Sequence, residues 1–276
     1  MSQPIAVITG CSSGIGRALA KRYQKAGYSV WACARKSHDV AALNAEGFVG
    51  VELDVNNAEH IAALANALQA QSAPVNVLIN NAGYGAMGPL LDEGASGMQK
   101  QFATNVFSLA ALTQALFPRL RASKGLVINI GSISSVFVTP FAGAYCASKA
   151  AVHAMSDALR MELAPFDIRV MEVQPGAIAS SFGNNAAQSA EEVINPNSPW
   201  WPLRTAIMAR ANASQQNPTS AEKFADTLFT AAHRPKPPRM IRIGNGSTAL
   251  PLMAKLLPQG LFEKKMRQRF GLNNPL

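Results

Sequence analysis

Short apolar runs alternate with helix-period segments along most of the chain. Seven runs have the length and composition of strands, at residues 5–9, 29–34, 49–54, 75–80, 126–130, 169–174 and 240–243. Between them, residues 14–26, 58–71, 97–121, 145–163 and 221–233 show the apolar period of helices. The runs are continuously apolar, which is typical of parallel strands buried on both faces. The pattern predicts an α/β fold, a Rossmann-type doubly wound parallel sheet in a three-layer α/β/α arrangement.

The C-terminal third departs from this alternation. Residues 179–219 are rich in Asn, Gln, Ser and Pro, and their length favours a lid over a site rather than a plain connection. Residues 248–276 are basic, amphipathic and interrupted by Pro258. We expect one catalytic domain over residues 1–247, including the lid, followed by a C-terminal helical extension.

Composition supports a compact protein. Of the 276 residues, 48% are hydrophobic and 15% charged, against about 25% charged in average domains, so a disordered chain is excluded. The first ten residues lack the basic and apolar regions of a secretory signal. The three cysteines, Cys11, Cys33 and Cys146, are odd in number and lack metal-ligand spacing. Together these features favour reduced thiols and a cytoplasmic protein.

The net charge of +9 is confined to one end. Residues 1–199 hold 13 basic and 13 acidic side chains, whereas residues 200–276 hold 12 basic and 3 acidic ones. This asymmetry argues against a nucleic-acid-binding protein and leaves a solvated tail or an anionic partner. Phe262, Met266 and Phe270 form one apolar stripe flanked by cations. Such a helix could lie on an anionic membrane surface or dock on the body or on a partner subunit.

A glycine-rich loop, TGCSSGIG, joins the first strand to the first helix at residues 9–16. Glycines let the backbone approach a pyrophosphate, and the helix N-terminus favours the anion. This strand–loop–helix context predicts a dinucleotide site. The residues expected to bind are Gly10, Ser12, Ser13, Gly14, Ile15 and Gly16.

Further motifs follow in a fixed order. They are Asp54, Asn81-Ala82-Gly83, Asn105, Ser132, Tyr145-x-x-x-Lys149 and Pro175-Gly176. With the TGxxxGIG loop, this order over residues 4–180 resembles the classical short-chain dehydrogenase/reductase family. The resemblance implies hydride transfer between nicotinamide C4 and a carbonyl or alcohol carbon, with no metal. It also implies cofactor contacts from Asp54, Val55, Asn81, Ala82, Gly83, Pro175, Gly176, Ile178 and Ser180.

Tyr145 and Lys149 are four residues apart and share one helix face. A nearby cation lowers the pKa of a tyrosine, normally ~10, by ~1–3 units. Lys149 and an oxidised nicotinamide would thus make Tyr145 an acid or base near pH 7. Ser132 follows a buried strand, where open α/β sheets bind ligands, and would hold the substrate oxygen. The resemblance assigns these roles, adds Asn105 as part of a water relay, and places Lys149 on the nicotinamide ribose.

The second strand ends at Ala34 and is followed by Arg35 and Lys36. NAD-specific folds place an acid here, about 20 residues past the glycine loop, to bind the ribose 2′-hydroxyl. Arg35 would instead bind a 2′-phosphate through charge-assisted hydrogen bonds worth ~1.5–3 kcal/mol. We therefore expect NADP(H), as in family members with Arg at this position.

Substrate residues are harder to assign from the sequence. Val138, Trp200 and Trp201 are expected beside Ser132 and Tyr145, and such an apolar lining favours a hydrophobic ketone or alcohol. The C-terminal extension resembles the hydroxysteroid, retinol and acyl-dihydroxyacetone-phosphate reductase branch, which implies a steroid-, retinoid- or acyl-lipid-like substrate.

Two alternatives stay open. A 3-oxoacyl-carrier-protein reductase would suit a basic surface, although those enzymes usually end soon after the last strand. A non-catalytic NADP-sensing scaffold would have no need of the acid–base pair Tyr145 and Lys149. The resemblance also implies a homodimer or homotetramer, formed through the helices that hold Asn105 and Tyr145.

Overall fold

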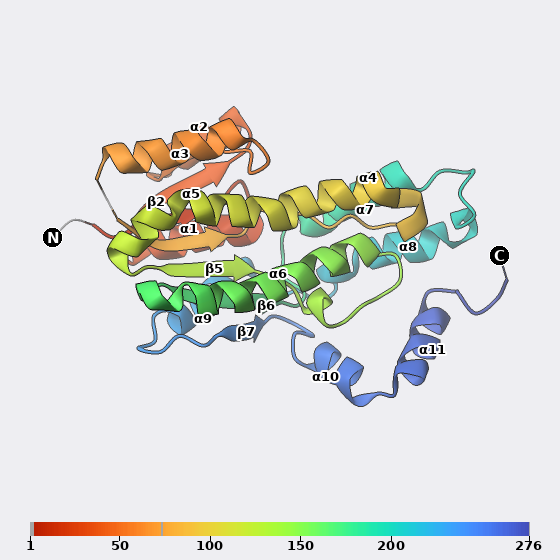
Figure 1. Cartoon of the computed structure of the whole chain (residues 1–276). Coiled ribbons are helices and arrows are strands. Elements are labelled where there is room, and N and C mark those ends of the chain that lie inside the picture. Colours follow the sequence, from red (N-terminus) through yellow and green to blue (C-terminus); the bar gives the residue numbers. More distant parts are fainter. Residues whose placement is uncertain (1–2, 73, 276) are drawn as a thin grey trace.

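The computed structural model describes residues 3–72 and 74–275. Seven parallel strands form one sheet in the order β3-β2-β1-β4-β5-β6-β7. The strands are β1 (Ile5–Ile8), β2 (Ser29–Ala34), β3 (Val49–Glu52), β4 (Val75–Asn80), β5 (Leu126–Ile130), β6 (Arg169–Pro175) and β7 (Met240–Ile243). The order reverses between β1 and β4, which opens a crevice beyond the carboxyl ends of these strands. The predicted doubly wound α/β fold is confirmed (Figure 1).

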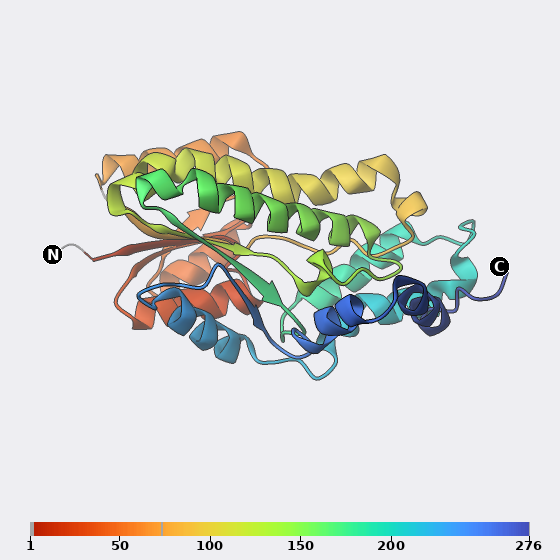
Figure 2. The same cartoon turned by 60° about the horizontal axis from the view of Figure 1, so that its bottom comes forward.

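Helices cover both faces of this sheet. They are α1 (Gly14–Lys25), α2 (Ser37–Ala45), α3 (Ala58–Ala70), α4 (Leu90–Phe102), α5 (Ser108–Ser123), α6 (Gly143–Glu162) and α9 (Ala221–Ala232). The apolar cluster on one face includes residues of α1, α2 and α9, and the cluster on the other includes α3, α5 and α6. Figure 2 shows α5 and α6 above the sheet and α9 below it.

Successive side chains along each strand belong alternately to the two apolar clusters. Ile8 and Ile79 belong to the cluster with α1 and α9, whereas Val7 and Leu78 belong to the one with α3 and α5. All four side chains have 0% exposure. Since successive strand residues point to opposite faces, only continuously apolar runs can fill two cores. Each such side chain contributes about 1.5–3 kcal/mol through burial.

Two helical segments differ from the sequence prediction. The helix expected at residues 97–121 is α4, a π-helical turn at Ala103–Phe107, and α5. α4 begins earlier, at Leu90, and continues across a kink at Gly94, whose φ of 58° is accessible to glycine. α2 was not expected, because Leu43 is its one buried residue and leaves no clear apolar stripe.

The predicted lid contains two helices, α7 (Phe182–Val193) and α8 (Arg204–Ala211). The C-terminal extension forms α10 (Ala249–Leu256) and α11 (Gln259–Arg269). Residues of the lid and of α11 share a third apolar cluster, separate from the two sheet clusters. Within the described residues, no helix is long and apolar enough to cross a membrane.

The apolar stripe of α11 packs on the body of the protein. The Phe262 ring lies 5.6 Å from that of Phe137, and the Phe270 ring lies 5.9 Å from that of Phe141. Met266 joins the same apolar cluster as Phe270, which is 6% exposed. The extension is therefore folded against the lid and the loop before α6 rather than being a solvated tail.

Candidate active site

A cavity of about 620 Å³ opens beyond the carboxyl ends of the central strands. Its walls come from the glycine loop, the loops after β4 and β5, the lid and the C-terminal extension. The volume lies within the usual range for ligand sites, about 300–1,000 Å³. Most predicted site residues line this one cavity: Gly10, Ser12, Ser13, Gly14, Ile15, Gly16, Asn81, Ala82, Gly83, Ser132, Tyr145, Lys149, Pro175, Gly176, Ile178 and Ser180.

The glycine loop has the conformation that a dinucleotide site needs. Gly10 and Gly14 have φ values of 71° and 54°, in the left-handed region. A Cβ on Gly16 would overlap the Gly10 carbonyl oxygen and lie 2.6 Å from Asn81 Nδ2. α1 has no side-chain cap at Ser13 and no acidic residue in its first turn, which leaves its N-terminal N–H groups available to an anion. The loop thus fits a pyrophosphate.

The loop after β4 is held against the end of β1. Thr9 Oγ1 accepts hydrogen bonds from the backbone N–H groups of Asn81, at 3.0 Å, and Ala82, at 2.8 Å. Asn81 Nδ2 in turn donates to the Thr9 carbonyl at 2.8 Å. These bonds across the switch point keep the floor of the cavity rigid beside the glycine loop.

Tyr145 and Lys149 lie one turn apart near the start of α6, and both are buried. Lys149 Nζ donates to the Ile130 carbonyl at 2.8 Å and lies 5.9 Å from the centre of the Tyr145 ring. Burial lowers the pKa of Lys149 to about 8, against the opposing negative charge of Glu172. The Lys149 ammonium can therefore lose and regain a proton near neutral pH.

Burial raises the pKa of Tyr145 to about 12, while a hydrogen bond with Ser132 acts in the opposite direction. The expected lowering by Lys149 is thus not seen in the protein alone, because desolvation of the buried phenol outweighs the nearby charges. A bound oxidised nicotinamide would supply a positive charge that favours the phenolate. Tyr145 and Ser132 thus lie side by side in the cavity lining.

Asn105 lies on the π-helical turn between α4 and α5. Its Nδ2 donates to the Tyr84 carbonyl at 3.0 Å and to Ser148 Oγ at 3.1 Å, and its Oδ1 accepts from the Tyr84 N–H at 3.2 Å. A pocket of about 10 Å³, close to the space one water needs, is lined by both Asn105 and Lys149. Asn105 therefore anchors the loop after β4 and borders a water-sized space beside the lysine.

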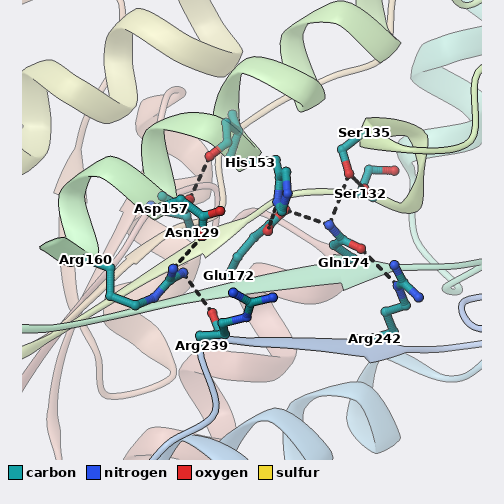
Figure 3. A network of polar contacts seen from close by, with 12 residues as sticks. Asn129, Ser132, Ser135, His153, Asp157, Arg160, Glu172, Gln174, Arg239 and Arg242 are labelled. Carbon is teal, nitrogen blue, oxygen red and sulfur yellow. Dashed lines mark hydrogen bonds and ion pairs between the residues drawn. The ribbon is translucent and has the colours of Figure 1, made fainter.

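Ser132 lies two residues after the end of β5 and is 6% exposed. Its Oγ accepts a hydrogen bond from the Ser134 N–H at 3.0 Å. Ser135 Oγ donates to the Ser132 carbonyl at 2.7 Å and accepts from Gln174 Nε2 at 3.1 Å. Figure 3 shows this network running from the Ser132 loop down to β6.

Glu172 is the charged centre of that network, with 0% exposure in the middle of β6. One carboxylate oxygen lies 2.6 Å from His153 Nδ1, and the other accepts from Gln174 Nε2 at 3.1 Å. Arg242 Nε donates to Gln174 Oε1 at 3.0 Å. None of these residues was predicted as part of the site, although a glutamate inside the apolar run 169–174 indicates a buried carboxylate with a partner.

Other predicted cofactor residues lie outside the cavity lining. Arg35 is exposed just after β2, and Asp54 lies beyond β3, where its Oδ1 accepts from the Asn56 N–H at 2.9 Å. Val55 borders the small pocket beside Asn105. These three residues occupy the β2–β3 side of the sheet, next to β1 and the glycine loop.

Of the predicted substrate residues, Ser132 and Tyr145 line the cavity, whereas Val138, Trp200 and Trp201 do not. Val138 is 57% exposed, and Trp200 and Trp201 are half-buried against the apolar cluster of the lid. The sequence could not show that these tryptophans pack against the lid cluster and do not line the cavity. The apolar lining comes instead from residues of the β5–α6 loop, the lid and the extension, namely Phe137, Phe182, Leu250, Met253, Met266 and Phe270.

The chain is similar in sequence to known proteins. Residues 4–191 match the family model described as short chain dehydrogenase. A short-chain dehydrogenase of Talaromyces islandicus is 34% identical over 276 residues, covering 97% of this chain and 95% of that protein. The NADPH-dependent 1-acyldihydroxyacetone phosphate reductase of Saccharomyces cerevisiae is 29% identical, covering 99% of this chain and 93% of that protein.

A solved short-chain dehydrogenase from Streptomyces avermitilis has the same fold. It superposes with a TM-score of 0.79 at 28% identity, covering 97% of this chain and 98% of that one. Its likeness extends through the lid and the extension, beyond the span of the family match. The chain therefore belongs to the short-chain dehydrogenase/reductase family, and it is an oxidoreductase that acts on CH–OH and C=O groups with a nicotinamide cofactor.

Proposed function

We propose that this protein is an NADP(H)-dependent oxidoreductase for the carbonyl or secondary alcohol of a hydrophobic substrate. The observation that carries the proposal is one cavity joining the glycine loop to Ser132, Tyr145 and Lys149, with an apolar far wall. Ser132 holds the substrate oxygen, Tyr145 exchanges a proton with it, and Lys149 relays that proton. The bound cofactor supplies or accepts the hydride.

The preference for NADP(H) rests on Arg35. Its side chain is exposed at the carboxyl end of β2 and makes no ion pair with any described residue. Ala34 stands where an acid would repel a 2′-phosphate. The yeast relative, which is named as NADPH-dependent, supports the same choice. Comparable thermal stabilisation of this protein by NADPH and NADH would contradict it.

The substrate class follows from the apolar wall. Phe137, Phe182, Met253 and Phe270 line the same cavity as Tyr145, and such surfaces favour an apolar ligand body. The name of the yeast relative, an acylated ketone reductase, supports a lipid-like substrate of the hydroxysteroid, retinol and acyl-ketone branch. We would measure NADPH oxidation across steroids, retinoids, acyl ketones, quinones and a 3-oxoacyl carrier protein.

The central test is Tyr145→Phe, which removes the exchangeable proton and keeps the ring. We expect loss of turnover with NADPH binding retained, because the hydroxyl is needed for the reaction and not for the cofactor. Tyr28→Phe is the matched control, since Tyr28 lies outside the cavity and its hydroxyl pairs with His233 at 2.9 Å. Activity that survives in Tyr145→Phe would overturn the mechanism, and an inactive wild-type protein would favour the sensing scaffold.

We also propose a homodimer or homotetramer formed through α5 and α6. Two large apolar side chains on this side are open to solvent, with Phe107 62% and Met161 71% exposed. Covering them would remove apolar surface from water. Light scattering of the wild type and of Phe107→Ser with Met161→Ser tests this, and an unchanged monomeric mass for both would reject it.

A peripheral membrane contact is a separate proposal for the α10–α11 corner. Leu252, Leu256 and Leu261 are 49%, 71% and 44% exposed there, and Lys255 and Lys264 lie nearby in sequence. Apolar and basic side chains together suit an anionic lipid surface. The double variant Leu256→Ser with Leu261→Ser should co-sediment with anionic vesicles less than the wild type does. Equal sedimentation of the variant and the wild type would reject the contact.

A further inference from the structure

We propose that Arg210 and Arg269 form a subsite for an anionic group on the substrate, a carboxylate or a phosphate. The inference rests on the proposed reductase function and narrows its substrate. It predicts an amphipathic ketone or alcohol whose apolar body fills the cavity and whose oxyanion contacts the two guanidinium groups.

The charge of the cavity lining points to this class. Among the described residues that line it there is no Asp or Glu, and the charged members are Lys149, Arg210 and Arg269. Lys149 is already engaged by the Ile130 carbonyl beside Tyr145. The two arginines are in none of the ion pairs formed by the residues that the structure describes. The substrate part of the cavity is therefore cationic and lacks a protein counter-ion.

Arg210 is held in place but not neutralised. It lies on α8, is partly buried, and its Nε donates to Thr139 Oγ1 at 2.6 Å. That bond uses one of five guanidinium N–H groups and orients the others. Burial and the nearby positive charge of Arg269 both lower the pKa of Arg210. Cations in such surroundings are normally paired with an anion, and here a ligand can supply it.

Arg269 reaches the same cavity from α11. It is exposed at the end of α11, next to Phe270, whose ring packs against Phe141 in the loop before α6. Apolar residues of α8 and α11 belong to the same cluster, and the charge of Arg269 is near enough to act on Arg210. Arg210 thus lies in the wall of the cavity and Arg269 at its rim. Two guanidinium groups can bind one carboxylate or phosphate through several N–H groups at once.

The subsite lies on the substrate side of the reaction centre. Arg210 is close enough to the Tyr145 hydroxyl for its charge to oppose the rise in the pKa of that phenol. The glycine loop, in contrast, contacts the start of α7, where Ser13 Oγ lies 2.7 Å from Ser181 Oγ. Figure 1 shows α8 and α11 beyond the carboxyl ends of the strands, away from α1. The cofactor phosphates at the glycine loop therefore leave both arginines to the substrate.

The experiment compares ketones that share one alkyl chain and differ in whether the head group is anionic or neutral. A long-chain oxo fatty acid, its methyl ester and the phosphate monoester of the matching oxo alcohol are assayed with NADPH. We expect kcat/KM to be about 10–100-fold higher for an anionic ketone than for the ester, the range of one or two charge-assisted hydrogen bonds. The anionic ketone with the larger increase in kcat/KM over the ester shows whether the subsite prefers a carboxylate or a phosphate.

Arg210→Gln and Arg269→Gln should each reduce the ratio of kcat/KM between anionic ketone and ester towards one. Arg204→Gln is the control, because Arg204 lies on the same helix, packs over Trp201 and does not line the cavity. A ratio that is near one in the wild type, or that is retained in both variants, would overturn the subsite. An equal loss on acid and ester in Arg210→Gln would also overturn it, since Arg210 would then act through Tyr145.

A binding measurement separates this proposal from the proposed function. Calorimetry of the NADP⁺ complex with laurate and with dodecanol should show tighter binding of laurate, with the difference lost in Arg210→Gln. If no ketone is reduced but this difference is present, the reductase function fails and the anion subsite stands. If ketones are reduced and laurate binds no better than dodecanol, the subsite fails and the function stands.

Discussion

Glu93 gives a stability prediction whose size follows from its surroundings. It lies in the first turn of α4 with 6% exposure, and neither carboxylate oxygen has a hydrogen-bond partner among the described residues. Burial raises its pKa from the usual 4.5 to about 7. A buried carboxylate without partners is the most costly state of this side chain, so the folded protein favours its protonated form.

The sign of the pH dependence follows from proton binding. Between pH 4.5 and 7 the folded state binds the Glu93 proton and the unfolded state does not, so the free energy of unfolding falls as pH rises. A difference of about 2.5 units corresponds to about 3 kcal/mol lost by pH 8, and to about 1 kcal/mol at pH 5. Glu93→Met keeps the length of the side chain and removes the charge, so it should recover most of this loss.

We would measure urea unfolding of the wild type and Glu93→Met at pH 5 and pH 8. The variant should be more stable by up to about 3 kcal/mol at pH 8, and the gain should shrink by about 2 kcal/mol at pH 5. Glu191→Met, on the exposed face of α7, is the control and should show no such change. The same gain at both pH values would refute the reasoning, and a loss at pH 8 would mean that Glu93 has a cationic partner.

Three further predictions concern the cofactor and the proton site. Gly16→Ala should abolish NADPH binding in a fluorescence titration, because its Cβ overlaps the Gly10 carbonyl, whereas Gly260→Ala has no atom within 4 Å and should bind normally. Arg35→Asp should weaken NADPH binding about 10–100-fold and spare NADH, with Lys36→Asp as the comparison; equal loss of both cofactors would contradict the role of Arg35. Glu172→Gln removes a charge that raises the pKa of Lys149, so the alkaline limb of the pH–kcat profile should move to lower pH. Glu162→Gln, on the exposed end of α6, should leave that limb in place.

The strands and most of the cofactor cavity were predictable from the sequence. Residues such as Val7 and Ile8 must both be buried, and only a sheet covered on two faces can bury them. The glycine loop and the Tyr145–Lys149 pair depend on local spacing, which the sequence displays directly. The order of their motifs along the chain predicts that they belong to one site.

The substrate wall could not be predicted in the same way. Its residues come from α7, α8, α10 and α11, whose mutual packing depends on tertiary contacts and not on local period. Trp200 and Trp201 were predicted to line the substrate site, but they pack against the lid cluster. Arg210 has no special sequence context, and its role depends on contacts such as the hydrogen bond to Thr139, which the sequence does not show. Non-local packing therefore decides which polar and aromatic side chains reach the substrate.

The separation of the lid cluster from the two sheet clusters bears on how the cavity opens. The two clusters on the sheet are distinct from the one that joins α7, α8 and the end of α11. Loss of contacts in this third cluster leaves the sheet and the glycine loop intact, so it is a sub-global opening that costs less than unfolding of the whole domain. Amide hydrogen exchange in α8 and α11 should accordingly be faster than in β1 and β4. Ligands would enter through this local fluctuation, so that their binding and release depend on the stability of the cluster that joins the lid to the C-terminal extension.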